Sequence, residues 1–165
     1  MLTINEIYEY SSRVRRKFLQ KLAELPWEEV AKNREASYYS MKNILIHIIE
    51  NEDWIVNWVV YNRATEYKRA HRSEDYTSIL MIREHLDEVE RKTKAYLERA
   101  DKEVLEKRVN FTLSSGQTFD LSVEESLFQS FTEQLYHIGE LIALLWQQNI
   151  EPPTMQYFYN NPRAR

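Results

Sequence analysis

A chain of 165 residues can bury a substantial hydrophobic core, and its balance of apolar and charged residues is that of an ordinary folded protein. The net charge of −4 gives no reason to expect nucleic-acid binding, and the lack of cysteine excludes a disulfide framework and a catalytic thiol. No apolar run approaches the roughly 20 residues that span a bilayer, and the first residues lack the pattern of a signal peptide. We therefore expect one cytoplasmic domain over residues 1–165, with no affinity for membranes.

Helix-breaking residues are scarce, since glycine occurs twice and proline four times, and this favours long helices. Thr3 and Glu6 have the spacing of a capping box. Apolar residues then recur three or four positions apart as far as Leu25, which predicts a helix that ends at Pro26. The basic run at 13–17 lies within this helix, where we expect it on a solvated face.

The second predicted helix runs from about Met41 to Tyr61, and either Ser37 or Ser40 can cap its start. It is apolar on most sides, which is typical of a helix that packs between two neighbours. The charged stretch 62–75 has no apolar rhythm and is expected to be a long loop.

A third helix is expected to start at Asp75 or Thr77 and to reach about Ala100, with a charged outer face that places it at the surface. The segment 109–121 then alternates apolar and polar residues on both sides of a Ser-Ser-Gly sequence. That pattern predicts a short β-hairpin.

Ser122 and Glu125 form a second capping box, which opens a fourth helix through about Gln148. Two prolines follow and stop it. The fold class expected from these elements is all-α, an up-down four-helix bundle with a long middle connection and a short β-hairpin before the last helix.

Two histidines stand out because each lies in one of the two most apolar helices. His47 is in the second helix, and His137 is in the fourth, one turn after Glu133. At 100° per residue, both imidazoles turn toward the interior or its rim, and Glu133 projects to the same side as His137. Two imidazoles and a carboxylate suit a divalent metal with positions left open for chemistry. Hydrogen-bonded core histidines are the alternative.

Other groups near the histidines have less specific signals. Glu50 and Glu140 each follow a histidine by three residues, and we expect them to support the ligands from behind or to lie at the surface. Glu52 and Asp53 are expected to be solvent-exposed or ion-paired. Gly139 lies inside a helix at a cost of about 1 kcal/mol relative to alanine, so we expect another helix or a ligand to approach it closely; a glycine that is simply tolerated is the alternative.

The remaining histidines, His71 in the charged connection and His85 in the third helix, are expected to face solvent. Trp54, Trp58 and Tyr136 could wall a pocket for an apolar or aromatic substrate. For the two tryptophans, core packing is the simpler interpretation.

With these residues in place, the sequence resembles the DinB-like (DinB/YfiT) family, a four-helix bundle with one histidine in its second helix and a His-x-x-x-His element in its fourth. Leu45-Ile-His47 and His137-Ile-Gly-Glu140 look like the family's elements. This chain departs from the family at two positions: Glu133 stands where the first histidine of the fourth helix is expected, and Ile138 stands where an arginine is common. The resemblance implies a metal triad of His47, Glu133 and His137 that holds one divalent ion, zinc, nickel, iron or manganese. A decayed site is the alternative.

The resemblance also implies an enzyme that acts on a small molecule, by thiol transfer or hydrolysis through a metal-activated thiol or water. A low-molecular-weight thiol would then be a partner, and a homodimer is expected. The competing interpretation is a non-catalytic metal- or ligand-binding bundle that serves as an oligomeric scaffold or stress protein. A third interpretation is a nucleic-acid-associated stress protein, which the charge distribution does not support.

Overall fold

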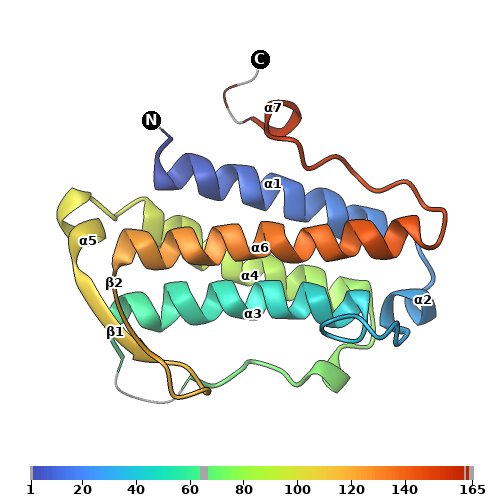
Figure 1. The fold of residues 1–165 in the computed structure, drawn as a ribbon, viewed down its shortest axis with the longest axis horizontal. Helices are drawn as coiled ribbons and strands as arrows, with labels where there is room; N and C mark the ends of the chain where they lie inside the picture. The colour runs from blue at the N-terminus through green and yellow to red at the C-terminus, as the bar shows by residue number, and fades with distance from the viewer. Residues whose placement is uncertain (1, 64–66, 162, 164–165) are drawn as a thin grey trace.

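The computed structural model describes residues 2–63, 67–161 and 163, and in these ranges the chain is mostly helical with one small antiparallel sheet. Figure 1 shows four long helices side by side: α1 (Ile4–Ala23), α3 (Met41–Asn57), α4 (Ile79–Leu97) and α6 (Val123–Trp146). The shorter helical elements are α2 (Trp27–Ala31), η1 (Val59–Tyr61), η2 (Ser73–Asp75), α5 (Lys102–Glu106) and α7 (Tyr157–Asn160). Within these ranges, no helix is long and apolar enough to cross a membrane.

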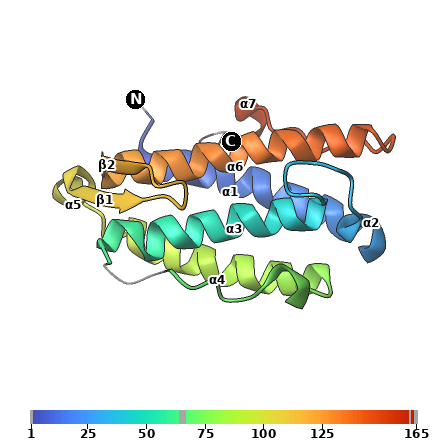
Figure 2. The same ribbon diagram turned by 60° about the horizontal axis from the view of Figure 1, so that its bottom comes forward.

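The connection between α3 and α4 carries the chain back along the length of the molecule, so these two helices run in the same direction and α1 and α6 run the opposite way (Figure 1). This connection follows the outer side of α3 and α4 (Figure 2). Lys42 of α3 donates a hydrogen bond of 3.0 Å to the carbonyl of Ser73, which fixes its far end. Residues 64–66 of the predicted loop lie outside the described residues.

Helix boundaries follow the capping residues closely. The Thr3 and Ser122 capping boxes are both formed, and Ser40, not Ser37, caps α3. The predicted start of the third helix was wrong by a few residues. The helix begins after Ser78, whose hydroxyl accepts a hydrogen bond from the free amide of Met81. The second predicted helix is also shorter than expected, since its last turn becomes the separate 3-10 helix η1.

The predicted β-hairpin is confirmed as β1 (Arg108–Thr112) and β2 (Thr118–Ser122). The strands are in register from the pair Arg108 and Ser122 to the pair Thr112 and Thr118. Gly116 takes a positive φ of 84° in the turn, a conformation that costs glycine little. The hairpin lies between α6 and α3, alongside the C-terminal half of α3 (Figure 2).

The hydrophobic core is divided into two clusters. One includes Phe18, Ile48 and Leu141, and the other includes Ile55 and Phe131. Between them, every long helix contributes buried polar side chains that hydrogen-bond to one another, and these form a polar layer that consists of Ser12, Arg15, Glu52, Glu90, Thr93 and Gln134. The stability of the protein therefore depends on how well this layer satisfies its own charges and hydrogen bonds.

Arg15 is the centre of the polar layer and is fully buried, so the expectation of a solvated face for the run 13–17 was wrong at this residue. Its guanidinium lies 2.5 Å from Glu52 and 2.9 Å from Glu90. Burial opposes the charge, but the two carboxylates raise the pKa of Arg15 above its ordinary value. Glu52 is likewise buried. Of the two alternatives expected for it, the ion pair is therefore confirmed and exposure to solvent is excluded.

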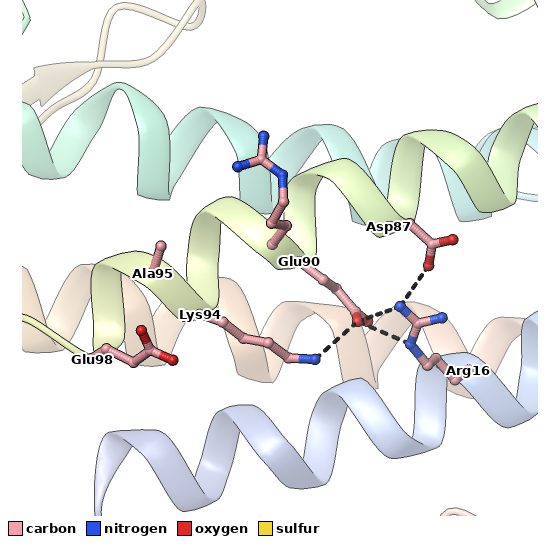
Figure 3. A pocket seen from close by; sticks show the side chains of 7 residues that line it. Arg16, Asp87, Glu90, Lys94, Ala95 and Glu98 are labelled. Carbon is pink, nitrogen blue, oxygen red and sulfur yellow. Dashed lines mark hydrogen bonds and ion pairs between the residues drawn. The ribbon is translucent and has the colours of Figure 1, made fainter.

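The outer side of the polar layer is open to solvent between α1 and α4. There Arg16 and Lys94 both reach Glu90, and Arg16 also pairs with Asp87 (Figure 3). Glu90 thus has partners besides Arg15, whereas Glu52 has Arg15 as its cation and Thr93 and Gln134 as hydrogen-bond donors.

His85 is buried, not solvent-facing as expected, and the hydroxyl of Tyr76 lies 2.6 Å from its Nδ1. Burial lowers the pKa of the imidazole below its ordinary value of 6.5. The folded protein therefore holds His85 in the neutral form, in which Nδ1 can accept the hydrogen bond from Tyr76.

This burial predicts a pH-dependent loss of stability. The unfolded chain takes up a proton on His85 at a higher pH than the folded protein does. The stability that neutral His85 contributes to the fold is therefore complete above about pH 6.5, and it is lost as pH falls through the lower pKa of the folded protein. We expect His85→Gln, which keeps an acceptor for Tyr76, to lose less unfolding free energy than the wild type between pH 7.5 and 5.5 in urea titrations. Parallel losses in the two proteins would contradict this account.

Candidate metal centre

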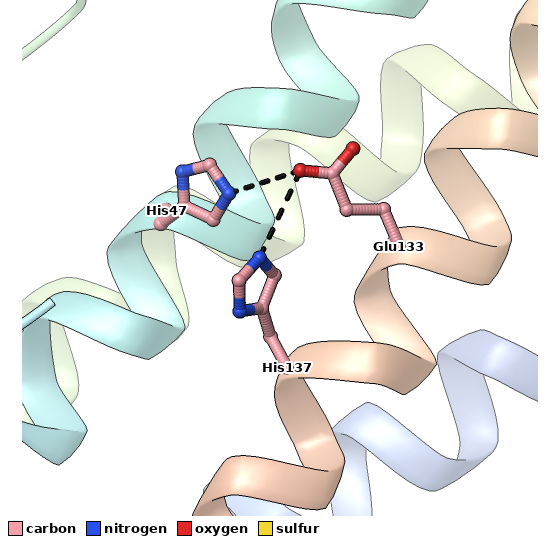
Figure 4. A group of neighbouring side chains, drawn as sticks. All are labelled: His47, Glu133 and His137. Carbon is pink, nitrogen blue, oxygen red and sulfur yellow. Dashed lines mark hydrogen bonds and ion pairs between the residues drawn. The ribbon is translucent and has the colours of Figure 1, made fainter. Parts of the chain in front are cut away.

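His47, Glu133 and His137 come together on the facing sides of α3 and α6 (Figure 4). One ligand atom from each residue lies within 4.8 Å of the other two. The Nε2 atoms of His47 and His137 lie 3.2 Å and 3.8 Å from the same carboxylate oxygen, Oε1 of Glu133. Because α3 and α6 are antiparallel neighbours, residues 86 positions apart in sequence meet here.

The second oxygen of Glu133 is held by two amides. Asn51 and Gln129 donate hydrogen bonds of 3.3 and 3.4 Å to Oε2. The hydrogen bond with His47 is the largest cause that lowers the pKa of Glu133, and Gln129 acts in the same direction, against the opposing effect of burial. The carboxylate therefore stays ionised, as a metal ligand must.

His137 is oriented from behind by Glu140. Oε2 of Glu140 accepts a hydrogen bond of 3.0 Å from Nδ1 of the imidazole, and the hydroxyl of Ser37 donates one of 2.7 Å to the same oxygen. With the proton on Nδ1, the lone pair of Nε2 faces Glu133. A carboxylate behind a histidine is the usual support of a metal-ligating imidazole.

Tyr38 covers the site from the loop before α3. Its ring stacks on His47 with centroids 4.0 Å apart, and its hydroxyl lies 3.0 Å from Nε2 of His47. A tight turn positions it, in which the amide of Tyr39 donates to the carbonyl of Ala36 at 2.9 Å. Burial, together with the nearby charge of Glu133, raises the pKa of Tyr38, so its hydroxyl keeps its proton at neutral pH.

The triad is partly open to solvent. The side chain of His137 is 8% exposed, whereas those of His47 and Glu133 are 21% and 27% exposed. Tyr136 stands at the rim with its ring 5.0 Å from that of His137 and is itself exposed. The three side chains are therefore not sealed from solvent.

The other predicted residues have different roles. Glu50 is buried, pairs with Arg69 of the long connection at 3.4 Å and hydrogen-bonds neither histidine, so the expectation for it was wrong. Asp53 pairs with Lys92 at 3.5 Å, which confirms the ion pair. A methyl group on Gly139 would meet nothing within 4 Å in the described chain, so the predicted close approach of another helix was wrong, and the close approach of a ligand stays a prediction.

Four residues of the site were missing from the sequence prediction, namely Ser37, Tyr38, Asn51 and Gln129 as supporting groups. Asn51 and Gln129 had a signal, since each lies four residues from a predicted ligand on the same helix face. Ser37 and Tyr38 lie in a loop, where no periodicity indicates the direction of a side chain.

The support from Glu140 predicts a measurable effect on metal affinity. Loss of such a supporting group typically costs 10–100-fold, so we expect Glu140→Ala to weaken zinc binding by about tenfold or more in competition with a chromophoric chelator. Glu124→Ala, an exposed glutamate of the same helix, should bind zinc like the wild type. Equal affinities of the two variants would show that Glu140 does not support the site.

Comparison with known proteins gives a family match. The family model described as the DinB family matches residues 1–163. A search of curated protein sequences finds no match.

Proposed function

Because the chain belongs to the DinB family, we propose that it is a mononuclear metal-dependent enzyme that acts on a small molecule through His47, Glu133 and His137. The observation that carries this proposal is the approach of two imidazole nitrogens to one carboxylate oxygen, at 3.2 and 3.8 Å. Ligands at bonds of about 2.0–2.2 Å around a tetrahedral ion lie about 3.3–3.6 Å apart, so only small side-chain movements are needed. Such a donor set suits zinc, nickel, iron or manganese.

A bound divalent ion supplies a Lewis acid that lowers the pKa of a coordinated thiol or water toward neutrality. Side chains around the triad hold its ligands in position. Asn51 and Gln129 hold Glu133, and Glu140 fixes the tautomer of His137. The hydroxyl of Tyr38, which lies 3.0 Å from Nε2 of His47 and keeps its proton, would donate a hydrogen bond to a thiol or water held beside His47. Thiol transfer and hydrolysis are the reactions that we propose for this site.

The alternative is that the same triad binds a metal or ligand without catalysis, in an oligomeric scaffold or stress protein. The four long helices fit a four-helix bundle with a long middle connection, which makes α3 and α4 parallel and departs from a simple up-down order. The homodimer, the cytoplasmic location, the thiol partner and the lack of nucleic-acid binding stay predictions.

Activity assays on zinc- and manganese-loaded protein separate enzyme from binder. We expect addition of a low-molecular-weight thiol to 1-chloro-2,4-dinitrobenzene, or hydrolysis of 4-nitrophenyl acetate, at least about 100-fold faster than in chelator-treated protein. His137→Ala should be as slow as the chelator-treated protein. Bound metal without turnover in either assay would favour the non-catalytic alternative, and turnover that resists the chelator would contradict the proposed role of the metal.

A further inference from the structure

A pocket of about 410 Å³ lies at the C-terminal end of α3, between that helix, the start of the long connection and the β-hairpin. Trp54 and Trp58 line it from α3, Phe111 from β1, and Arg63 and Tyr67 from the connection. Its size is within the range of small-molecule sites. Among the described residues that line it, Arg63 is the one that carries a charge, so this part of the lining favours an anion.

The aromatic walls of the pocket are braced by contacts with one another. The rings of Trp54 and Phe111 meet edge to face at 5.3 Å, and those of Trp58 and Tyr67 at 5.9 Å. The hydroxyl of Tyr67 donates a hydrogen bond of 2.8 Å to Asp53. The walls are therefore held in place before any ligand binds, which lowers the entropic cost of binding a flat ring.

Arg63 is directed over the tryptophan by the backbone. Asn62 takes a left-handed conformation, with φ of 49°, and reverses the chain after η1. The guanidinium carbon of Arg63 then lies 5.2 Å from the ring centroid of Trp58 and 5.4 Å from that of Tyr61. Stacking of a guanidinium on its face leaves its in-plane N–H donors available to an anion.

The pocket and the metal centre share one face of α3. His47, Asn51, Trp54 and Trp58 follow one another at steps of three or four residues, and two turns from His47 to Trp54 span about 10 Å. Asn51 lies between them and contacts Glu133. The wall of the pocket nearest the triad, at Trp54, thus lies about two helical turns from His47.

We propose that this pocket binds the body of the substrate, a small molecule with an aromatic or flat apolar ring and a carboxylate or other anionic group. The ring packs against Trp54 and Trp58, and the anionic group meets Arg63. That the bound molecule is the substrate rests on the proposed function of the triad, whereas binding itself does not.

Calorimetric titration of the metal-free full-length chain tests the binding, with 2-naphthoate as the anionic probe and 2-naphthamide as its neutral counterpart. We expect the naphthoate to bind about fivefold more tightly, and Arg63→Gln to remove this preference while Arg91→Gln, an exposed arginine on α4, keeps it. Trp58→Leu should weaken both ligands about tenfold. Equal affinities of the two probes, or an unchanged preference in Arg63→Gln, would overturn the proposal.

A second measurement tests the connection to the metal centre. With Mn²⁺ added, the proton relaxation of bound 2-naphthoate should be strongly enhanced in the wild type and not in His47→Ala. Binding of Mn²⁺ without enhancement would overturn the assignment as a substrate pocket. If calorimetry shows naphthoate binding but Mn²⁺ does not bind, the failure lies with the proposed metal centre, and the anion pocket stands without the role in catalysis.

Discussion

Replacement of Arg15 with methionine is expected to lower the free energy of unfolding by about 3–5 kcal/mol, the usual cost of removing one partner from a buried ion pair. The side chain of Glu52 is 0% exposed, and Arg15 is its cation. Methionine fills a similar volume, so the loss would come from the uncompensated carboxylate and not from a cavity. Denaturant titration with guanidinium chloride measures the difference.

Arg13→Met is the matched control, because Arg13 lies two residues away on the exposed face of the same helix. We expect it to change the unfolding free energy by no more than about 0.5 kcal/mol. Adding Glu52→Gln to Arg15→Met should restore part of the loss, since it removes the buried charge. If Arg15→Met and Arg13→Met unfolded at the same denaturant concentration, the polar layer would not contribute as we describe.

The second large effect is expected at the triad. His47→Ala and His137→Ala each remove one of three ligands, so zinc affinity should fall by more than the roughly 100-fold upper limit seen for loss of supporting groups. Glu133→His supplies an imidazole at the same position, and we expect it to retain zinc binding, whereas Glu133→Ala should not. Calorimetric titration with zinc gives the affinities.

His71→Ala is the control for the histidine variants, because His71 is exposed in the long connection. It should bind zinc like the wild type. Loss of binding in Glu133→His together with Glu133→Ala would mean that the carboxylate acts in some way other than as a replaceable ligand. Wild-type affinity in His47→Ala would remove this residue from the site.

The long elements were predictable because hydrophobic periodicity and capping residues act over many positions. The Thr3 and Ser122 capping boxes fixed two helix starts within a residue. The five-residue helices α2 and α5 were missed, since they are shorter than two helical turns and leave no periodic signal. Tertiary packing of their few apolar side chains decides their conformation.

The polar layer was missed although its positions carried a signal. Arg15 falls between Ser11 and Phe18 at steps of four and three residues, on the apolar stripe of its helix. His85 falls in the same way between Ile82 and Val89. The charge of these side chains indicates exposure, whereas the buried partners that stabilise them come from other helices and are not visible in the local sequence.

The triad could be proposed from helical spacing and the family resemblance, since each ligand lies in a long helix whose buried side is readable. Trp54 and Trp58 were predicted to wall a pocket and do line one, but Tyr38 and Arg63 could not be predicted, because both lie in loops. Loop side chains are placed by long-range contacts, and a single sequence gives no register for those.

Metal analysis of the wild-type chain, purified without chelators and then dialysed, tests the central claim most directly. We expect close to one equivalent of a divalent transition metal per chain, or one equivalent after incubation with zinc, and none in the His47→Ala, His137→Ala double variant. A wild-type protein that is well folded but retains no zinc, nickel, iron or manganese after incubation with each would contradict the assignment of His47, Glu133 and His137 as a metal centre.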